Sequence, residues 1–331
     1  MKIISILGTV AAAAALTACS SGSGGTGGKV TGNTGADKVL ATSNNSAAKE
    51  LAEGTTLRAS GRTSSAWVRD FTDGADTAVL AADSTVRIRR NELGGLDLIT
   101  PNGTFQFTAA DLTEDGYGFD TGTAGLWVWN GDSMADALNP DGEVRHNLVF
   151  NYYYDYNSSF SNNGFGVVGT ETPDAALAAL PTATYAGEAR VQVAPAEGFT
   201  DWNTQVSSAR GDLELTANFG AGEVSGSIGN LESRLPSGID PSGTWTPFDG
   251  SLTLETAAIA GNGFSGAVTA DAGFNANVGT LDASSRYSGT FFGPNAEEVA
   301  GGLSLSGTAA DPEDPANPDY LGIGFIRGWQ P

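Results

Sequence analysis

The sequence predicts an all-β protein, in which an irregular β handle domain is followed by an eight-stranded antiparallel up-and-down β-barrel. From residue 55 onward, short runs of alternating apolar and polar residues are separated by Gly, Asp, Asn and Pro, a pattern typical of half-buried strands joined by turns. After residue 180 the alternation becomes more regular and the connections become short. A continuous meander of this kind favours a barrel, because closure removes the unpaired edges of a sheet.

The first β region, residues 55–178, reads as short strands with irregular connections that carry Asp-Gly and Asn-Gly turn signals. The expected strands are Ala66–Asp70, Thr77–Leu80, Val86–Arg89, Leu96–Thr100, Gly103–Thr108, Gly125–Trp129 and Arg145–Tyr154. Ser133–Leu138 is expected to be a short helix. Pro173 and Pro181 bracket an alanine-rich stretch, which we interpret as a turn of helix connecting two domains.

The second β region, residues 179–331, is expected to form the barrel. One parity is apolar, as in Leu213, Leu215 and Ala217, and the other is Glu, Thr, Ser and Asn. A membrane porin would instead carry apolar residues outward, so a soluble barrel is predicted. The expected strands are Thr182–Val193, Gly211–Phe219, Gly222–Leu231, Gly250–Ala258, Phe264–Ala270, Gly273–Thr280, Ser284–Phe292, Val299–Ser306 and Leu321–Ile326.

The N-terminus carries a secretion signal, with Lys2 ahead of an apolar segment too short to span a bilayer as a permanent helix. It ends Leu-Thr-Ala-Cys, which resembles the bacterial lipobox. This resemblance implies that residues 1–18 are a lipoprotein signal peptide and that Cys19 carries the lipid anchor. The alternative is an ordinary signal peptide with a chance cysteine. Residues 19–54 are rich in Gly, Ser, Thr and Asn and are predicted to be a flexible tether.

The chain is strongly acidic, with a net charge of -22 from 38 acidic and 16 basic residues. This charge argues against binding to nucleic acid. All four lysines precede residue 50, so the acidity also fits a bias of genome or habitat. Cys19 is the only cysteine, so no disulfide is expected.

Two expected strands in YSGTFFGPNAEEVAGGLSLSG, residues 287–307, are joined by a turn that contains two adjacent glutamates. Pro294 suits the first turn of a helix, where carboxylates are favoured, so we interpret Glu297 and Glu298 as cap residues facing water. The alternative is a catalytic pair, although adjacent carboxylates do not converge on one substrate. Phe291 is expected inside the barrel and Phe292 outside it, under the turn.

The same stretch resembles the penultimate hairpin of the transferrin-binding protein B family. Residues 185–189 and 224–228 resemble earlier strands of that barrel, and the sequence departs from the pattern where Ala300 is inserted before the paired glycines. The resemblance covers the barrel region, and full members of the family carry two handle-plus-barrel lobes, so it implies a single lobe here. The matching residues are Gly289, Phe291, Phe292, Gly293, Pro294, Ala296, Glu297, Glu298, Gly301 and Gly302.

Members of that family are surface lipoproteins that bind a host or environmental protein, or haem. The resemblance therefore implies a lipid-anchored outer-membrane protein, facing the cell exterior, that captures an extracellular protein, iron or haem source for uptake. It also implies a TonB-dependent outer-membrane receptor and a surface-lipoprotein exporter as partners. Ligand contacts in the family lie on variable loops, so the resemblance assigns no binding residue.

The candidate ligand-binding residues are aromatic. His146, the only histidine, shares strand parity with Tyr152 and Tyr154, and both residue types ligate haem iron. The alternative is an aromatic face that covers the handle interior. Trp202 and Trp245 are candidate anchors on loops, and the alternative for both is a plug in the barrel mouth.

The residue types argue against an enzyme. With one histidine and no cysteine beyond Cys19, most hydrolytic and redox chemistries lack their usual groups, and no nucleotide or zinc motif is present. The acidic turns at 70–76 and 311–319 lack EF-hand spacing. We predict no catalytic residue, no metal and no cofactor. The main alternative to a binding module is a structural or assembly lipoprotein of the envelope without a small ligand, and a glycan-cleaving enzyme is a third hypothesis.

Overall fold

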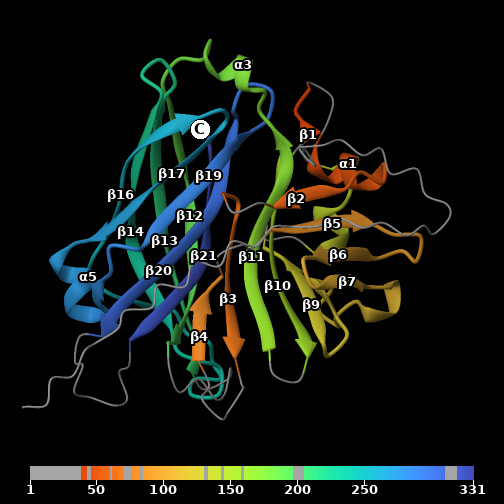
Figure 1. Cartoon of the computed structure of the whole chain (residues 1–331), viewed down its shortest axis with the longest axis horizontal. Helices are drawn as coiled ribbons and strands as arrows, with labels where there is room; N and C mark the ends of the chain where they lie inside the picture. Colours follow the sequence, from red (N-terminus) through yellow and green to blue (C-terminus); the bar gives the residue numbers. More distant parts are fainter. Residues whose placement is uncertain are drawn as a thin grey trace, which may run out of the picture. The chain divides into compact units, whose positions relative to one another are not determined.

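The computed structural model describes residues 39–42, 46–59, 62–70, 77–81, 85–129, 133–142, 145–157, 160–196, 205–309 and 319–331. Strands dominate these ranges and the helices are short (Figure 1), so the all-β prediction is confirmed. No helix in the described ranges has the length and apolar character needed to cross a bilayer. The predicted signal peptide, Cys19 and Trp202 lie outside the described residues.

Eight strands of the C-terminal half form a closed barrel (Figure 1). Each strand pairs antiparallel with the next, and the last pairs with the first from Ala186–Trp329 to Pro195–Tyr320, which confirms the predicted eight-stranded antiparallel barrel. The barrel strands are β12 (Ala183–Pro195), β13 (Ser207–Asn218), β14 (Glu223–Arg234), β16 (Leu252–Ala260), β17 (Gly263–Ala270), β19 (Arg286–Phe292), β20 (Glu298–Ala309) and β21 (Tyr320–Trp329). Two short strands, β15 (Thr246–Pro247) and β18 (Gly279–Leu281), add to β14 and β20.

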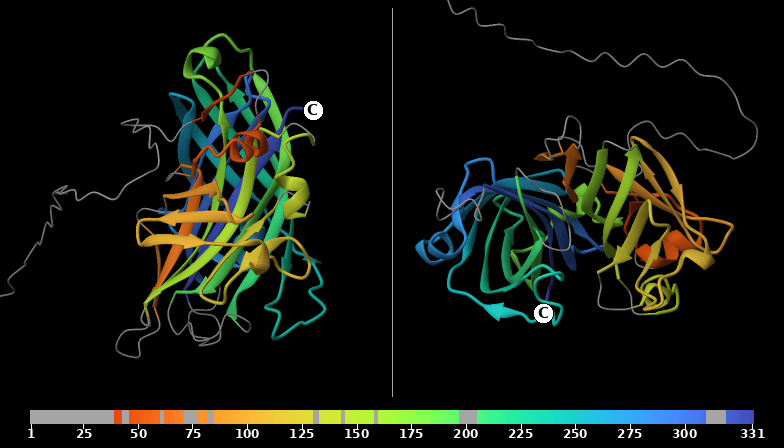
Figure 2. Two further views of the ribbon diagram at one scale, coloured as in Figure 1. Left: turned by 90° about the vertical axis from the view of Figure 1, so that its right-hand side faces the viewer. Right: turned by 90° about the horizontal axis from the view of Figure 1, so that it is seen from below.

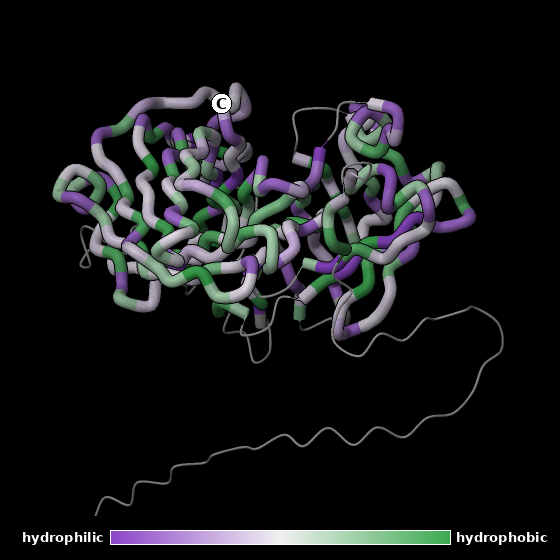
Figure 3. The backbone as a smooth tube through the Cα atoms, turned by 90° about the horizontal axis from the view of Figure 1, so that it is seen from above, coloured by the Kyte–Doolittle hydropathy of each residue, from purple (hydrophilic) through white to green (hydrophobic). Residues whose placement is uncertain are grey.

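The barrel core follows the parity of the strands. On β13 the side chains of Leu213, Leu215 and Ala217 are buried, whereas Glu214 and Thr216 between them are exposed. The same alternation of apolar and polar segments runs along the tubes in Figure 3. The strand period of two therefore places one face of each strand inside the barrel.

One segment expected to be a strand is a helix. The prediction of a strand at Gly273–Thr280 is wrong for its first part, which forms α5 (Ala272–Asn277). The side chain of Asp271 accepts a hydrogen bond from the backbone N–H of Phe274 at 2.8 Å, which is a helix N-cap. The buried Phe274 ring lies 6.3 Å from that of Phe248. The cap, rather than the alternation, decides the local structure.

The two phenylalanines of the β19–β20 hairpin point to opposite sides of the barrel wall. Phe291 lies in the barrel core, with its ring 5.0 Å from Phe219 and 5.5 Å from Phe264, as predicted. Phe292 belongs to a different cluster, together with handle residues such as Val149 and Val167. It is therefore outside the barrel as predicted, but the handle covers it rather than the turn.

The turn of this hairpin is not helical, which corrects the expected helical cap. Residues 293–297 form an irregular turn in which Ala296 has a φ of 58° and is fully buried. The carbonyl of Ala296 accepts hydrogen bonds from the hydroxyl of Tyr185 and from Nε2 of Gln330, both at 2.8 Å. Tertiary hydrogen bonds thus hold a left-handed alanine that the sequence pattern does not predict.

The handle contains two sheets (Figure 1). The larger is built on the long β10–β11 hairpin, and the smaller is an antiparallel set of four strands. The strands of the larger sheet are β8 (Gly118–Asp120), β9 (Ala124–Val128), β10 (Asn147–Asn157), β11 (Phe160–Glu171), β3 (Ser64–Asp70) and β4 (Thr77–Leu80), with β1 (Val39–Leu40) parallel to the end of β11. The smaller sheet contains β2 (Leu57–Ala59), β5 (Val86–Arg90), β6 (Leu96–Thr100) and β7 (Gly103–Gln106).

The predicted short helices of the handle region are present. Ser133 caps α2 (Met134–Ala137), and α3 (Asp174–Leu177) follows Pro173 between handle and barrel. A further helix, α1 (Ala47–Ala52), lies inside the range predicted to be flexible tether. Its Ala47 and Leu51 are fully buried in the handle core. The tether prediction is therefore too long, because the small apolar face of this helix packs on the handle sheets.

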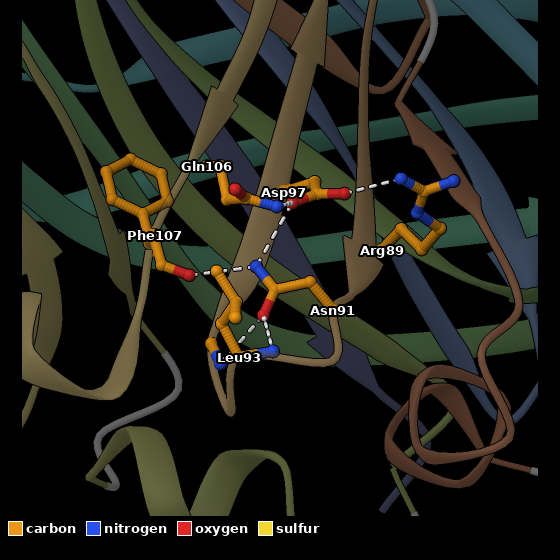
Figure 4. A network of polar contacts seen from close by, with 7 residues as sticks. Arg89, Asn91, Leu93, Asp97, Gln106 and Phe107 are labelled. Atoms are coloured by element: carbon orange, nitrogen blue, oxygen red, sulfur yellow. Dashed lines mark hydrogen bonds and ion pairs between the residues drawn. The ribbon is translucent and has the colours of Figure 1, made fainter. Parts of the chain in front are cut away.

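A buried carboxylate organises the smaller sheet (Figure 4). Asp97 is 2% exposed and accepts hydrogen bonds from Nη2 of Arg89 at 2.5 Å and Nδ2 of Asn91 at 3.0 Å. Oδ1 of Asn91 in turn accepts from the backbone N–H groups of Leu93 and Gly95, so the network fixes the β5–β6 turn. Because every bond of this network ends within the sheet or its turn, we interpret Asp97 as structural.

The handle sheet packs on the outside of the barrel wall (Figure 2). The contact is an apolar cluster that includes Trp67 and Phe165 from the handle and Ile323 and Phe325 from β21. At its centre the hydroxyl of Ser65 donates to the carbonyl of Gly324 at 2.6 Å and accepts from its N–H at 2.9 Å. Buried polar groups that satisfy each other across an apolar contact fix its register.

Candidate functional site

The handle and the barrel wall enclose a cleft of about 670 Å³. Strands β9, β10 and β3 of the handle form one side, and β12 and β21 of the barrel form the other. Its lining includes the aromatic Trp127, Trp129 and Tyr153, the amide Asn151, and the cationic Arg69, Arg190 and Arg327. A concave site that combines aromatic side chains with a few convergent polar groups is the usual form of a ligand-binding site.

The aromatic side of the cleft is held in place by the handle sheet. Trp127 stacks on Tyr153 with ring centroids 5.7 Å apart, and Nε1 of Trp129 donates to Oδ1 of Asn151 at 2.7 Å. Gly125 leaves the space that the indole of Trp127 occupies, because a Cβ there would lie 2.3 Å from that ring. Both tryptophans keep part of their surface exposed, so the fixed rings face the cleft.

The barrel side of the cleft is cationic. The guanidinium of Arg190 lies 4.8 Å from the ring centroid of Trp129, a cation–π arrangement that spans the cleft. Glu188 accepts from Nε of Arg190 at 2.9 Å and from Nε of Arg327 at 2.7 Å. Burial by itself would raise the pKa of Glu188, but the two guanidinium groups outweigh it and hold the pKa below its usual range. Among the described residues that line the cleft, Asp155 is the only carboxylate.

The depressed pKa of Glu188 makes a pH-dependent prediction. Glu188→Gln should lower the free energy of unfolding by about 2 kcal/mol at pH 7, because Arg190 and the buried Arg327 lose their charged partner. An acid with a lowered folded-state pKa contributes stability above its unfolded pKa and loses it as the pH falls through the folded value. The difference in the free energy of unfolding between the variant and the unchanged protein should therefore become smaller as the pH falls below 4.5, the usual pKa of a glutamate.

Urea unfolding at several pH values measures this difference. Glu214→Gln is the matched control, because Glu214 is an exposed carboxylate on the outer face of β13. A Glu188 effect that stays constant between pH 3 and pH 7 would show that the two ion pairs do not stabilise the fold.

His146 does not lie in the cleft. It is 8% exposed and sits at the junction of handle and barrel, where Nδ1 lies 3.4 Å from the hydroxyl of Thr170. Its backbone N–H donates to the carboxylate of Glu298 at 3.1 Å. Glu298 is therefore a junction residue, which corrects its expected role as a water-facing helix cap.

Tyr152 and Tyr154 lie inside the handle, as the interior interpretation predicted. They are 1% and 2% exposed and belong to the handle core, where their rings stack at 6.2 Å. The hydroxyl of Tyr154 accepts from Nδ2 of Asn102 at 3.3 Å. As ligand contacts, His146 and the two tyrosines remain a prediction that would require the handle core to open.

Trp245 lies on the outer surface of the barrel, away from the cleft. Its ring is flanked by the guanidinium groups of Arg210 at 4.3 Å and Arg234 at 5.1 Å. The indole is partly exposed, so its predicted role as an anchor remains open. Trp202, the other candidate anchor, lies outside the described residues.

Sequence analysis missed most residues of the cleft. The strand parity that puts Tyr152 and Tyr154 in the handle core puts Asn151 and Tyr153 on the opposite face, beside Trp127. That shared face was available as a signal in the sequence. The sequence carries no such signal for Arg190 and Arg327, because their place in the cleft depends on which part of the barrel wall the handle covers.

The described residues contain no group of three or more His, Cys, Asp or Glu side chains placed to hold a metal ion. Two charged groups of the cleft, Arg190 and Arg327, are paired with Glu188, and Arg190 also lies over the ring of Trp129. The arrangement is thus suited to binding an aromatic or anionic surface rather than to proton transfer at a reacting atom.

A family model confirms the type of barrel. The model of the C-lobe and N-lobe beta barrels of Tf-binding protein B matches residues 179–315. The barrel region is therefore similar to the beta barrels of Tf-binding protein B. The match confirms the resemblance seen in the β19–β20 hairpin, and the described residues contain one handle-plus-barrel lobe of this type. The description of this family model names a binding protein.

A comparison with solved structures found matches at low sequence identity. Transferrin binding protein B from serogroup B Neisseria meningitidis is 16% identical with a TM-score of 0.41, over 81% of this chain and 43% of that one. The haemoglobin receptor HpuA from Kingella denitrificans is 14% identical with a TM-score of 0.39, over 88% of this chain and 93% of that one. The chain thus spans less than half the length of the transferrin-binding protein that it matches. A comparison with curated protein sequences found no match.

Proposed function

We propose that this protein is a lipid-anchored surface lipoprotein of the outer membrane that captures an extracellular protein, iron or haem source for uptake. The observation that carries the proposal is the cleft between handle and barrel, where fixed and partly exposed tryptophans face arginines. The family of the barrel, whose name describes the binding of transferrin, supports a binding role.

The residue types of the cleft favour a protein partner. Tryptophan, tyrosine and arginine dominate the binding energy of protein interfaces, because they bury a large area and carry a polar group. Trp127 and Trp129 are already held by Tyr153 and Asn151, so binding would cost little side-chain entropy. The arginines place positive charge in the cleft, although the chain as a whole carries a net negative charge. They would attract an anionic surface or a carboxylate-bearing ligand.

The remaining parts of the proposal rest on the sequence. Cys19 would carry the lipid, and part of residues 19–54 would serve as the tether that lets the lobe reach its partner. A TonB-dependent receptor would take the captured cargo, and a surface-lipoprotein exporter would place the protein on the cell exterior. A structural or assembly role in the envelope, without a ligand, is the alternative.

Replacement of one cleft tryptophan tests the proposal. The purified protein is titrated with iron-loaded transferrin, haemoglobin and haemin in separate experiments. Where one of them binds, Trp127→Ala should weaken binding by about 2 kcal/mol, roughly 30-fold, because it removes an anchor from the centre of the cleft. Circular dichroism and urea unfolding report whether each variant keeps its fold.

Trp245→Ala is the matched variant, because it removes the same side chain from the outer surface of the barrel. It should leave binding unchanged. Loss of binding with Trp245→Ala but not with Trp127→Ala would indicate that the binding site lies on the outer surface of the barrel. Failure of all three ligands, and of capture from the natural growth medium, would favour the structural role.

A further inference from the structure

A second cavity, of about 480 Å³, lies inside one end of the barrel, at the end where α5 lies. Strands β12, β13, β14 and β20 contribute its walls and α5 contributes part of its edge. Figure 2 shows the barrel from this end in its right-hand view. The cavity walls are mainly apolar side chains that point to the inside of the barrel, whereas the cleft lies outside the barrel wall.

The two ends of the barrel are filled differently. Five large aromatic side chains fill the other end, with ring centroids between 5.0 and 6.0 Å apart in each contact. They are Tyr185, Phe219, Phe264, Tyr287 and Phe291, and all are buried.

At the α5 end, the inward positions of β12 and β13 carry small residues instead, among them Ala189, Ala209 and Gly211. An eight-stranded barrel has just enough interior for side chains to fill it or for one small ligand. Because these side chains are small, they do not fill this end of the barrel, and the cavity remains.

The apolar lining of the hollow is incompletely covered. Val193, Ala209, Phe248 and Val278 pack against the barrel core yet remain partly exposed. Most of the other apolar side chains of the barrel core are buried. Each Å² of such surface left in water costs about 25 cal/mol, so an apolar molecule in the cavity would remove an existing cost.

The wall formed by α5 is fixed rather than free to swing. The helix packs directly against Gly250, where a Cβ would lie 2.3 Å from the backbone nitrogen of Phe274. The side chain of Asp271 caps the helix and also accepts from the hydroxyl of Ser251 at 2.8 Å. The cavity is thus part of the folded barrel, and its volume lies in the range of about 300–1,000 Å³ that is common for small-ligand sites.

Several polar groups of the lining lie toward the ends of β13 and β14, and three others, Arg190, Asn277 and Tyr320, come from β12, α5 and β21. Ser233 pairs with Ala209 across these strands, so both side chains face the same side, and Ser207 is two residues before Ala209 on that face. Arg210 also lines the cavity, held by Glu232 through Nε at 2.6 Å. This arrangement has one apolar interior and one polar edge.

We propose that the α5 end of the barrel binds a single-chain amphipathic lipid, with its aliphatic chain inside the barrel and its polar end at Ser207 and Ser233. Such a ligand matches an apolar cavity with a polar edge. A two-chain phospholipid would demand more apolar volume and a wider entrance. Arg190 lines both the cavity and the cleft, but the proposed lipid contacts lie on the inner face of the barrel and do not require the capture function proposed above.

A fluorescent fatty acid tests the proposal. The full-length protein is titrated with cis-parinaric acid, which should bind saturably with one site per chain. Unlabelled dodecanoate and a single-chain lysophospholipid should each displace the probe, and the more effective of the two identifies the preferred polar end. A two-chain phospholipid should displace it at least tenfold less effectively.

Filling the cavity should abolish the site. Ala209→Phe places a ring in the hollow and should weaken probe binding at least tenfold. Thr216→Phe is the matched control, because Thr216 lies on the exposed outer face of the same strand. Val193→Phe fills the cavity from β12 and replaces Ala209→Phe if that variant does not fold. Unchanged binding in the folded cavity variants, or equal loss with Thr216→Phe, would overturn the proposal.

Discussion

Phe291→Ala should lower the free energy of unfolding by about 3–5 kcal/mol, because it removes a ring from the filled end of the barrel. Phe291 is fully buried and contacts the rings of Tyr185, Phe219 and Phe264. These neighbours come from three other elements of the closed wall and cannot move together into the space. Urea unfolding followed by circular dichroism measures the loss.

Leu93→Ala serves as the control for this variant. Leu93 is 52% exposed in the turn between β5 and β6, so its truncation should change stability by less than about 0.5 kcal/mol. A Phe291 variant as stable as this control would mean that the ring does not pack in the barrel core.

The barrel was predictable because its signal is local and repeated. Strand parity places Phe291 inside, and the hairpin that contains it carries the glycine and proline pattern of the family. Errors occurred where one side chain overrides the pattern. Asp271 caps α5 inside an apparent strand. Buried Ala296 takes a left-handed conformation, and its carbonyl accepts a hydrogen bond from Tyr185 on β12, more than 100 residues away in the sequence.

The cleft was harder to predict because two distant parts of the chain form it. The sequence shows that Trp127 and Trp129 share a face, but it does not show that β12 and β21 lie opposite them. The sequence around Tyr152 is rich in aromatic residues, which predicted a binding site there. Clustered aromatic residues are as common in hydrophobic cores as in binding sites. The register of β10 against β9, which the structure supplies, separates the two faces.

A tertiary contact gives Glu298 a structural role that its local sequence does not predict. Its carboxylate accepts hydrogen bonds from the backbone N–H groups of His146 and Asn147 and from the side-chain amide of Asn147. Both donor residues are 8% exposed, so little water is available to replace the acceptor. The side chain of the adjacent Glu297 accepts instead within its own turn, from the N–H of Asn295 and from its side-chain amide, both at 2.9 Å.

Glu298→Ala should therefore lower the free energy of unfolding by about 3 kcal/mol, because it leaves two buried backbone donors without their acceptor. Glu297→Gln, the matched change one residue away, should cost at most about 1 kcal/mol. The contact joins the handle to the barrel, so the Glu298 variant should also raise amide hydrogen exchange at His146 and Asn147 before it affects the barrel core. If both variants lose the same small amount of unfolding free energy, Glu298 does not stabilise the junction of handle and barrel. Both glutamates would then be local turn residues.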